Sequence, residues 1–302
     1  MYDIIIAGGG PAGMTAALYA LRNGKSALVI EKNGFGGQIT HSPKVENFPG
    51  TLSLSGNEIA DKMLEQILAQ GADIELETVT NVRTEGEHKV VTTEEGGSYE
   101  ASAVILATGV KHRMLGLEGE DDLVGDGISF CAVCDGDFYA GKTVCVAGGG
   151  NSALQEAVLL AEKCKEVIML QDLPFFTGEA RLQDVLFARD NVRAITEVKF
   201  ERLLVENDEL RGVEILHNGE KQAIACDGLF VAVGLIPENE PFAELADLNS
   251  FGYFDSDEQC LTKTPGVFVA GDCRSKFVRQ VTTAAADGAV AALAACRYIN
   301  GL

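Results

Sequence analysis

The sequence predicts an α/β protein made of two Rossmann-like domains, each doubly wound and three-layered, with the second domain inserted into the first. Two observations lead to this prediction. An apolar strand, a glycine-rich turn, a helix and a second strand follow one another at the N-terminus, and the same order returns over residues 142–172. Such a succession is a βαβ unit, whose two strands are parallel. With 302 residues, the chain is long enough for two domains that each bury a core.

The first unit contains a G-x-G-x-x-G turn formed by Gly8, Gly10 and Gly13, between a run of isoleucines and an alanine-rich helix. In such a turn the first glycine permits the sharp bend, the second lets the backbone approach a diphosphate, and the third lets the helix pack on the strand. Glu31 ends the second strand, where a carboxylate can accept hydrogen bonds from ribose hydroxyls. We therefore expect a dinucleotide site. The alternatives are a turn without a ligand and, for Glu31, a solvated acid.

The second unit has the same layout but a different side chain at the end of its second strand. Its turn reads G-G-G-N-S-A, its helix is expected over 154–162, and Gln171 stands where Glu31 stands in the first unit. Short strands separated by turns follow each unit, over 73–106 and over 192–234. The candidate residues for a second nucleotide are Gly148, Gly150, Asn151, Ser152, Ala153, Gln171 and Asp172.

The C-terminal segment is expected to complete the first domain. It contains one strand and turn over 266–272 and an alanine-rich helix over 282–299, but no βαβ unit of its own. One strand and one helix do not make a packed layer structure by themselves. We therefore expect the first domain to comprise residues 1–112 and 240–302, and the inserted domain to comprise residues 113–239.

Composition and charge exclude several classes of partner. The formal net charge of −21 argues against nucleic acid and against an anionic membrane surface, because both require clusters of lysine and arginine. No apolar run approaches the roughly 18 residues of a membrane-spanning helix. The first residues lead directly into a strand, without a charged leader or a cleavage site. We expect a cytoplasmic protein.

A pair of cysteines, Cys131 and Cys134, lies just before the second unit, and Asp135 follows it directly. Two thiols at this spacing can close a small, reactive disulfide, and a helix N-terminus lowers the pKa of a thiol. A zinc site would need two more cysteines or histidines at suitable spacing, and because none stands nearby we predict no metal site. Asp135 can carry a proton for the thiolate that leaves, or it caps a helix. The six other cysteines are scattered and are expected to fill the core.

Several short motifs occur together over nearly the whole chain. They are G-G-G-P-A-G at 8–13, G-G-Q at 36–38, E-N-F-P-G at 46–50, A-T-G at 107–109, C-A-V-C-D at 131–135, G-D at 271–272 and R-Q-V at 279–281. In this order and spacing the chain resembles the low-molecular-weight thioredoxin reductases, which are FAD-dependent pyridine nucleotide-disulfide oxidoreductases of class II.

The resemblance implies an FAD held by the first domain. The family pattern places the adenosine ribose at Glu31, the surroundings of the flavin ring at Gln38 and Asn47, the ribityl chain at Asp272, and the ring edge at Gln280 with its neighbour. The residues carried over are Gly8, Gly10, Pro11, Ala12, Gly13, Glu31, Gly37, Gln38, Asn47, Thr108, Gly109, Gly271, Asp272, Arg279, Gln280 and Val281.

The resemblance also implies a reaction. Reduced flavin would pass electrons to the disulfide of Cys131 and Cys134, with Cys134 next to the flavin. Cys131 would attack the disulfide of a thioredoxin- or glutaredoxin-like protein, and Asp135 would serve as acid and base. The family rotates one domain against the other so that one flavin face serves two reactants in turn. It also implies a homodimer, and an inserted domain that resembles an NAD(P)-binding domain.

The chain departs from the family after the second strand of the inserted domain. Members that use NADPH carry H-R-R and a further arginine there, and these guanidinium groups bind the 2′-phosphate. This chain reads Q-D-L-P-F-F-T-G-E over 171–179, with no basic residue before Arg181. Asp172 and Glu179 would repel the phosphate, and each charge-assisted hydrogen bond that is lost costs about 1.5–3 kcal/mol. We therefore expect that NADPH is not the donor.

Two electron donors remain. NADH lacks the 2′-phosphate, and Gln171 or Asp172 could accept a hydrogen bond from its 2′-hydroxyl. Ferredoxin is the donor of members that no longer bind a nicotinamide, but these usually have a decayed glycine turn, whereas the turn here is intact through Ala153. The sequence therefore favours NADH over ferredoxin. A non-catalytic, flavin-binding sensor is a third hypothesis, against which the intact cysteine pair and Asp135 argue.

The surroundings of the cysteine pair depart from the family at two positions. Asp126 stands in G-D-G where the family usually has G-R-G, and Asp137 stands where the first of two aromatic residues usually follows C-D-G. Acids thus replace a basic and an aromatic docking contact. We expect a redoxin partner with a more basic face.

Overall fold

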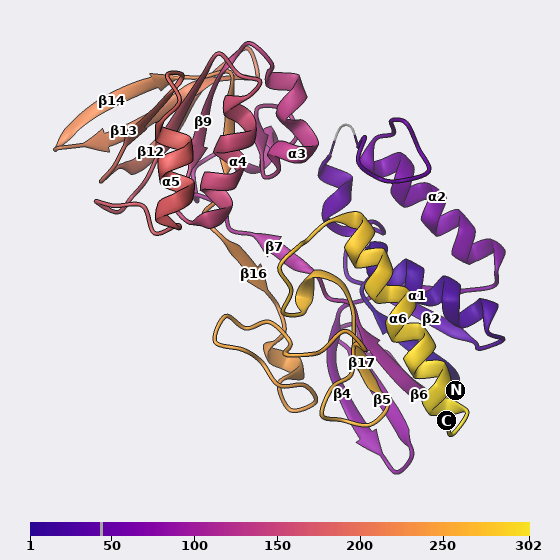
Figure 1. Cartoon of the computed structure of the whole chain (residues 1–302). Helices are drawn as coiled ribbons and strands as arrows, with labels where there is room; N and C mark the ends of the chain where they lie inside the picture. The colour runs from indigo at the N-terminus through magenta and orange to yellow at the C-terminus, as the bar shows by residue number, and fades with distance from the viewer. Residues whose placement is uncertain (43–44) are drawn as a thin grey trace. The chain divides into compact units, whose positions relative to one another are not determined.

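The computed structural model describes residues 1–42 and 45–302. The chain folds into two compact units, which Figure 1 colours along the sequence. The first unit consists of Met1–Thr40, Val45–Lys111 and Ile236–Leu302, and the second mainly of His112–Leu235. Two short strands, β7 (Val110–His112) and β16 (Leu235–Pro237), pair with each other where the chain passes between the units.

The first unit is built on a 7-stranded sheet in the order β3-β2-β1-β6-β5-β4, with β17 paired to β6. The strands β3, β2, β1, β6 and β17 are parallel, and β5 and β4 continue the sheet in antiparallel fashion. The bounds are β1 (Tyr2–Ala7), β2 (Ala27–Glu31), β3 (Asp73–Leu76), β4 (Val79–Glu85), β5 (His88–Thr93), β6 (Ser98–Leu106) and β17 (Val267–Val269).

Alternate residues of β1 point to opposite faces of this sheet, because side chains alternate along a strand. Ile4 and Ile6 pack with helices on one face, and Ile5 packs with Phe242 and Phe254 on the other. The helices are α1 (Pro11–Arg22), α2 (Gly56–Ala69) and α6 (Val281–Ile299), and α1 and α6 lie side by side (Figure 1). Short 3-10 turns cover Gly37–His41, Glu240–Phe242 and Gly271–Cys273.

The second unit has a 5-stranded parallel sheet in the order β11-β10-β9-β15-β8 and a 3-stranded antiparallel sheet, β12-β13-β14. Its strands are β8 (Ile128–Ser129), β9 (Thr143–Ala147), β10 (Glu166–Leu170), β11 (Val192–Ile195), β12 (Lys199–Glu206), β13 (Glu209–His217), β14 (Glu220–Ala225) and β15 (Gly228–Val231). Its helices are α3 (Ala132–Asp135), α4 (Asn151–Ala161) and α5 (Ala180–Phe187), with 3-10 turns at Asp121–Leu123 and Gly136–Tyr139.

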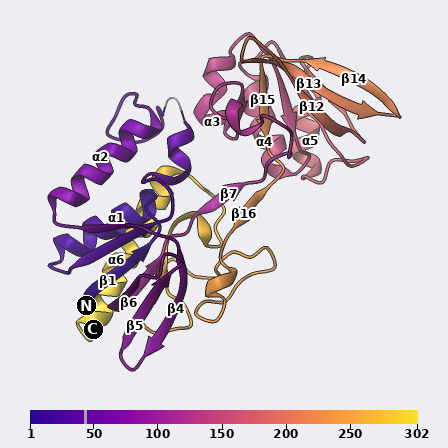
Figure 2. The same ribbon diagram turned by 180° about the vertical axis from the view of Figure 1, so that it is seen from behind.

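The second unit has three layers, which are its helices, the parallel sheet and the antiparallel sheet. Val144 and Val146 of β9 pack with Leu154 and Leu160 of α4, whereas Cys145 faces the side that the antiparallel sheet covers. Figure 2 shows this arrangement from behind, with β12, β13 and β14 on one side of the unit. The predicted α/β class with parallel sheets is confirmed.

The helix that follows the second glycine turn, α4, begins earlier than the sequence predicted. It was expected to start at Leu154, but α4 starts at Asn151. Gly150 has extended backbone angles and occupies the N-cap position, as Gly10 does for α1. The last residues of the G-x-G-x-x-G pattern therefore belong to the first helical turn, and the amide groups at the start of both helices face the glycine turn.

Candidate functional site

The two cysteines of the C-x-x-C motif form a disulfide at the start of α3. The Cα atoms of Cys131 and Cys134 are 5.3 Å apart, and the backbone amide of Cys134 lies 3.2 Å from the Sγ atom of Cys131. Both cysteines are half-buried, and Val133 between them is exposed. The predicted disulfide is confirmed. Its partial exposure leaves it accessible to the sulfur of another protein.

Asp135 follows Cys134 directly and occupies the N-cap position of the 3-10 turn Gly136–Tyr139, but its side chain makes no capping hydrogen bond. Its Oδ2 atom accepts a hydrogen bond of 2.6 Å from the hydroxyl group of Ser129, and its buried Oδ1 atom has no partner among the described residues. Burial raises the pKa of Asp135, and the hydrogen bond from Ser129 partly opposes this shift. A carboxyl group with a raised pKa, on the residue directly after the second cysteine of the pair, suits proton transfer.

A second carboxyl group, which the sequence did not indicate, reaches the same turn from α4. Glu156 accepts a hydrogen bond from the backbone amide of Ala132, the residue after Cys131. Burial first, and then the nearby charge of Asp135, raise the pKa of Glu156 to about 7. The only sequence signal was its place between Ala153 and Leu160 on the buried side of the helix.

The first glycine turn leaves no room for a side chain at Gly8 or at Gly13. Gly8 has φ +115°, and a Cβ atom there would lie 2.2 Å from the carbonyl oxygen of Ala107. A Cβ atom on Gly13 would lie 1.8 Å from the carbonyl oxygen of Gly8. Gly10 caps α1 without a side-chain hydrogen bond, and Pro11 is the first helical residue. The N-terminus of α1 therefore remains open to an anion.

Glu31 is tied to this turn and is not a solvated strand-end acid. Its Oε2 atom accepts a hydrogen bond of 2.6 Å from the amide of Gly9, and its Oε1 atom accepts one of 3.0 Å from the amide of Asn33. Glu31 is buried. The carboxylate is thus fixed at the end of β2, next to the glycine turn.

The other predicted cofactor residues of the first unit follow the ends of parallel strands. Gly8 follows β1, Thr108 and Gly109 follow β6, and Gly271 follows β17. Since these strands are parallel, their carboxyl ends meet at one edge of the sheet, the usual place for a ligand in such folds. Thr108 donates a hydrogen bond of 2.9 Å to Asn239, a buried residue that the sequence did not single out.

Two further hydrogen bonds join distant parts of this set. The Nδ2 atom of Asn47 donates to the Oε1 atom of Gln280 over 3.2 Å, and Gln280 caps α6 just before Val281. Arg279 donates to the carbonyl oxygen of Asp272 over 3.3 Å. Gly37 and Gln38 lie in the 3-10 turn Gly37–His41, with Gln38 exposed.

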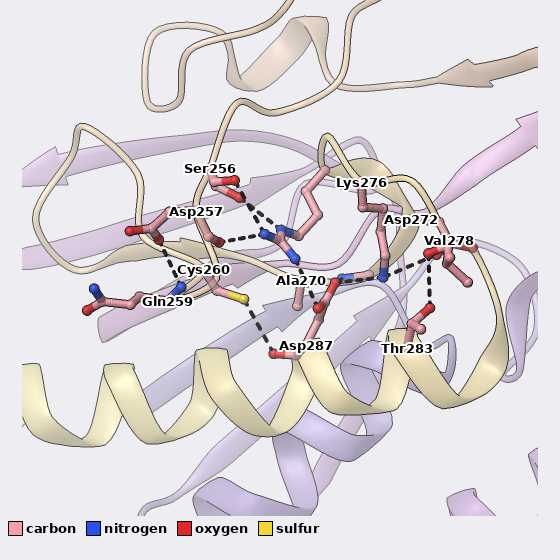
Figure 3. A network of polar contacts seen from close by, with 12 residues as sticks. Ser256, Asp257, Gln259, Cys260, Ala270, Asp272, Lys276, Val278, Thr283 and Asp287 are labelled. Carbon is pink, nitrogen blue, oxygen red and sulfur yellow. Dashed lines mark hydrogen bonds and ion pairs between the residues drawn. The ribbon is translucent and has the colours of Figure 1, made fainter.

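Asp272 has an acceptor atom that nothing in the described protein satisfies. Its Oδ1 atom is buried without a hydrogen-bond partner among those residues, and Figure 3 shows Asp272 next to Lys276. Burial raises the pKa of Asp272, whereas the charges of Lys276 and Arg279 act in the opposite direction. A buried carboxylate oxygen normally has a partner, so this atom marks a place for a ligand hydroxyl.

The second glycine turn has the backbone of the first. Gly148 has φ +124°, and the N-cap Gly150 has φ −83° and ψ 179°, close to the −76° and −177° of Gly10. Asn151 and Ser152 begin α4, and Ala153 takes the place of Gly13. The carbonyl oxygen of Gly149 accepts from the amide of Thr177, as that of Gly9 accepts from the amide of Gly36.

The two turns differ at the end of the second strand. Gln171 is buried with its carboxamide against Gly149, and its Nε2 atom donates a hydrogen bond of 3.2 Å to the carbonyl oxygen of Phe175. Glu31, in contrast, bonds to its glycine turn. Asp172 is exposed, and Glu179 exchanges two hydrogen bonds with Asn151.

Metal-ligand clusters and membrane-spanning helices are both absent from the part of the chain that the structure describes. Within residues 1–42 and 45–302, no three histidine, cysteine, aspartate or glutamate side chains are grouped so that they could hold a metal ion. No helix in those ranges is long and apolar enough to cross a membrane.

Comparisons with known proteins agree with the geometry. The sequence profile of pyridine nucleotide-disulphide oxidoreductases matches residues 2–288. The "34.2 kDa protein in rubredoxin operon" of Clostridium pasteurianum is 39% identical over 99% of this chain and 97% of its own length. The thioredoxin reductase of Bacillus subtilis is 37% identical over 100% of this chain and 96% of its own length.

A solved structure is similar throughout. The crystal structure of thioredoxin reductase from Streptococcus pyogenes has 38% identity and a TM-score of 0.92, and the match covers 100% of this chain and 99% of that one. The chain thus belongs to the pyridine nucleotide-disulphide oxidoreductases, among the low-molecular-weight thioredoxin reductases, and is an FAD-dependent disulfide oxidoreductase.

Proposed function

We propose that this protein reduces the disulfide of a thioredoxin- or glutaredoxin-like protein through its Cys131–Cys134 pair, with NADH as the electron donor. The observation that carries the proposal is the half-buried disulfide flanked by two carboxyl groups of raised pKa, Asp135 and Glu156. A disulfide that only stabilised the fold would have no use for proton carriers beside it.

The residues of the first unit fit FAD. Gly8 and Gly13 have no space for a Cβ atom, the N-terminus of α1 is open, and the Oδ1 atom of Asp272 lacks a hydrogen-bond partner among the described residues. We assign the diphosphate to the turn, the adenosine ribose to Glu31, the ribityl chain to Asp272, and the ring surroundings to Asn47 and Gln280. When bound, FAD would transfer electrons between the donor and the disulfide.

The thiol chemistry then follows from the pair itself. In the reduced protein, the thiolate of Cys131 attacks one sulfur of the partner's disulfide, which forms a mixed disulfide and releases the partner's other sulfur as a thiolate. The thiolate of Cys134 attacks the Sγ atom of Cys131, so the Cys131–Cys134 disulfide forms again and the partner leaves with two thiols. Asp135 supplies the proton for a departing thiolate, with Glu156 next to it.

The second unit supports NADH as the donor. Its glycine turn has the geometry of the first, which suits a diphosphate. No cation lies between Gln171 and Glu179, so a 2′-phosphate would lack the guanidinium groups that usually bind it. Gln171 and Asp172 carry oxygen atoms that could accept from a 2′-hydroxyl.

One observation favours a second donor, a small one-electron carrier protein. Gln171 uses its amide to hold its own loop through Phe175 and has no carboxylate, whereas Glu31 has one at the matching position of the first unit. The Clostridium pasteurianum relative is described by its place in a rubredoxin operon. Reduced ferredoxin or rubredoxin is therefore the alternative donor, with the same disulfide chemistry.

Mixing experiments decide between the donors. The FAD-loaded protein is mixed anaerobically with NADH, NADPH or reduced ferredoxin, and the loss of visible flavin absorbance is followed. We expect fast bleaching by NADH and slow bleaching by NADPH. If NADH does not bleach the flavin and reduced ferredoxin does so fast, NADH is not the electron donor and ferredoxin takes that role. The proposed disulfide chemistry would be unaffected by this result.

The variant Cys134→Ser tests the disulfide chemistry independently. It should lose reduction of a redoxin disulfide but keep flavin bleaching by the true donor. Unchanged turnover with the redoxin would refute the role of the pair, and the protein would then fit a flavin-binding sensor.

The surface around the disulfide indicates what the partner must offer. Val133 and Phe138 are partly exposed apolar side chains, and Asp126 is exposed. Asp137 pairs with Lys163 at 2.5 Å, so its charge is partly neutralised. We propose a partner with an apolar contact and a moderately basic rim, and a homodimeric, cytoplasmic enzyme.

A further inference from the structure

Next to Asp272, the first unit contains a cluster of charged side chains that have no role in the proposed disulfide reduction. Arg274, Lys276 and Asp287 have side-chain exposures of 9%, 10% and 14%, and that of Asp272 is 27%. Figure 3 shows Asp287 on α6 with Lys276 and Asp272 above it. Charged groups are seldom buried in this way unless they are paired.

Asp287 is held at both oxygen atoms. Its Oδ1 atom accepts from Arg274 over 3.0 Å, and its Oδ2 atom accepts from the backbone amide of Gly271 over 3.1 Å and from Lys276 over 2.9 Å. Arg274 in turn donates to the hydroxyl and carbonyl oxygens of Ser256. Asp287 is therefore a fixed anchor, and it fixes the Nζ atom of Lys276.

The Nζ atom of Lys276 lies 3.8 Å from the Oδ1 atom of Asp272, the atom that has no hydrogen-bond partner among the described residues. Two other charges act on this carboxyl group. Arg279 lies near, but its hydrogen bond goes to the carbonyl oxygen of Asp272, and Asp287 opposes ionisation. Lys276 is the larger of the two influences that lower the pKa of Asp272 against the effect of burial.

We propose that Lys276, anchored by Asp287, is a positioning residue for FAD: its ammonium group holds the carboxyl group of Asp272 so that the Oδ1 atom is available to a hydroxyl of the ribityl chain. This inference rests on the proposed placement of FAD at this edge of the sheet. A hydrogen bond to an ionised acceptor is about twice as strong as one between neutral groups. The retention of FAD should therefore depend on a lysine that does not touch it.

The pH dependence of FAD release separates this role from a merely structural one. Holoenzyme is diluted until FAD dissociates, and the fluorescence of the released FAD gives the dissociation constant between about pH 6 and about pH 9, a range in which an ordinary aspartate stays ionised. The wild-type constant should stay nearly flat. In Lys276→Met, the pKa of Asp272 rises further, so the carboxyl group takes up its proton at a higher pH than in the wild-type protein.

We expect Lys276→Met to bind FAD about tenfold more weakly near pH 6, the order of difference between a charge-assisted and a neutral hydrogen bond. The deficit should shrink toward pH 9, where Asp272 ionises without help. Lys276→Arg should restore flat behaviour.

Two controls complete the experiment. Lys263→Met removes an exposed lysine of the same unit, which pairs with Asp247 at 2.9 Å, and should leave FAD binding unchanged. Asp272→Asn should bind FAD weakly at every pH, because it cannot ionise. If Lys276→Met is poorly folded by circular dichroism, Lys276→Gln keeps the polar length and takes its place.

Two results would overturn the inference. Lys276→Met could retain FAD within twofold at every pH, or it could lose affinity equally across the range, which indicates a structural role. Both are distinct from a failure of the proposed function, in which the wild-type protein itself would hold no FAD or would reduce no redoxin.

Discussion

Replacement of Gly13 by alanine tests the close contact between α1 and the first glycine turn. The new Cβ atom would lie 1.8 Å from the carbonyl oxygen of Gly8 and 3.2 Å from a methyl group of Ile6, whereas ordinary contacts begin near 3.4 Å. The helix or the turn must therefore retreat. The helix has little freedom to do so, because Gly288 of α6 lies directly against the backbone of Ala12 on its other side.

The turn is therefore expected to open, and the amide groups that would bind the diphosphate move apart. Overpacking of this kind costs about 1–3 kcal/mol and occasionally more. At about 3 kcal/mol, the affinity for FAD would fall on the order of a hundredfold. The ratio of flavin to protein after purification, and the dissociation constant measured by FAD fluorescence, give the result.

Two variants serve as controls for Gly13→Ala. Gly34→Ala adds a methyl group where no atom lies within 4 Å and φ is not positive, so it should retain FAD. Ala153→Gly makes the opposite change at the same place in the second turn, and should cost about 1 kcal/mol of helix stability without affecting FAD. Wild-type FAD affinity in Gly13→Ala would refute the assignment of the diphosphate to this turn.

Three further variants test other parts of the structure. In Glu156→Gln, the fall in unfolding free energy between about pH 4.5 and pH 7 should become smaller, because the native protein binds a proton at Glu156 that the unfolded chain releases there. Denaturant titrations should find the variant more stable at about pH 8. Gly288→Ala would place a Cβ atom 2.1 Å from the carbonyl oxygen of Ala12, and calorimetry should show a loss of about 1–3 kcal/mol. Asp172→Arg with Thr177→Arg should shift the ratio of KM values toward NADPH by at least about tenfold, the effect of one charge-assisted hydrogen bond.

Each of these three has a clear contrary result. An unchanged pH slope in Glu156→Gln would mean that this carboxyl group is ionised in the native protein at neutral pH. Full stability of Gly288→Ala would mean that α1 and α6 can separate at low cost. An unaltered preference in the double arginine variant would place the adenosine end of any bound nucleotide away from residues 172–177.

The features that the sequence predicted are local ones. The positive φ angles of Gly8 and Gly148 follow from glycine spacing after an apolar strand, and the position of Glu31 follows from where the second strand ends. The disulfide of Cys131 and Cys134 is also local, because only two residues separate the thiols. In each case neighbours in the sequence determine the geometry.

The features that were missed depend on side chains that meet through the fold. Glu156 reaches Ala132 across a separation of 24 residues, and Asn47 reaches Gln280 across 233. Asp287, on a helix that looked like a plain alanine-rich element, turns out to hold Lys276. A hydrophobic pattern predicts which face of a helix is buried, but it does not predict which polar side chains of neighbouring elements contact that helix.

The six cysteines outside the redox pair are all buried as free thiols. Burial raises the pKa of Cys164 to about 11 and that of Cys260 to about 12, and a protonated, inaccessible thiol takes no part in exchange. A protein that breaks and forms disulfides for others thus contains no further accessible thiol that could attack its own disulfide. Its electron capacity is limited to one disulfide and one flavin, so its oxidation states are few and chemically distinct.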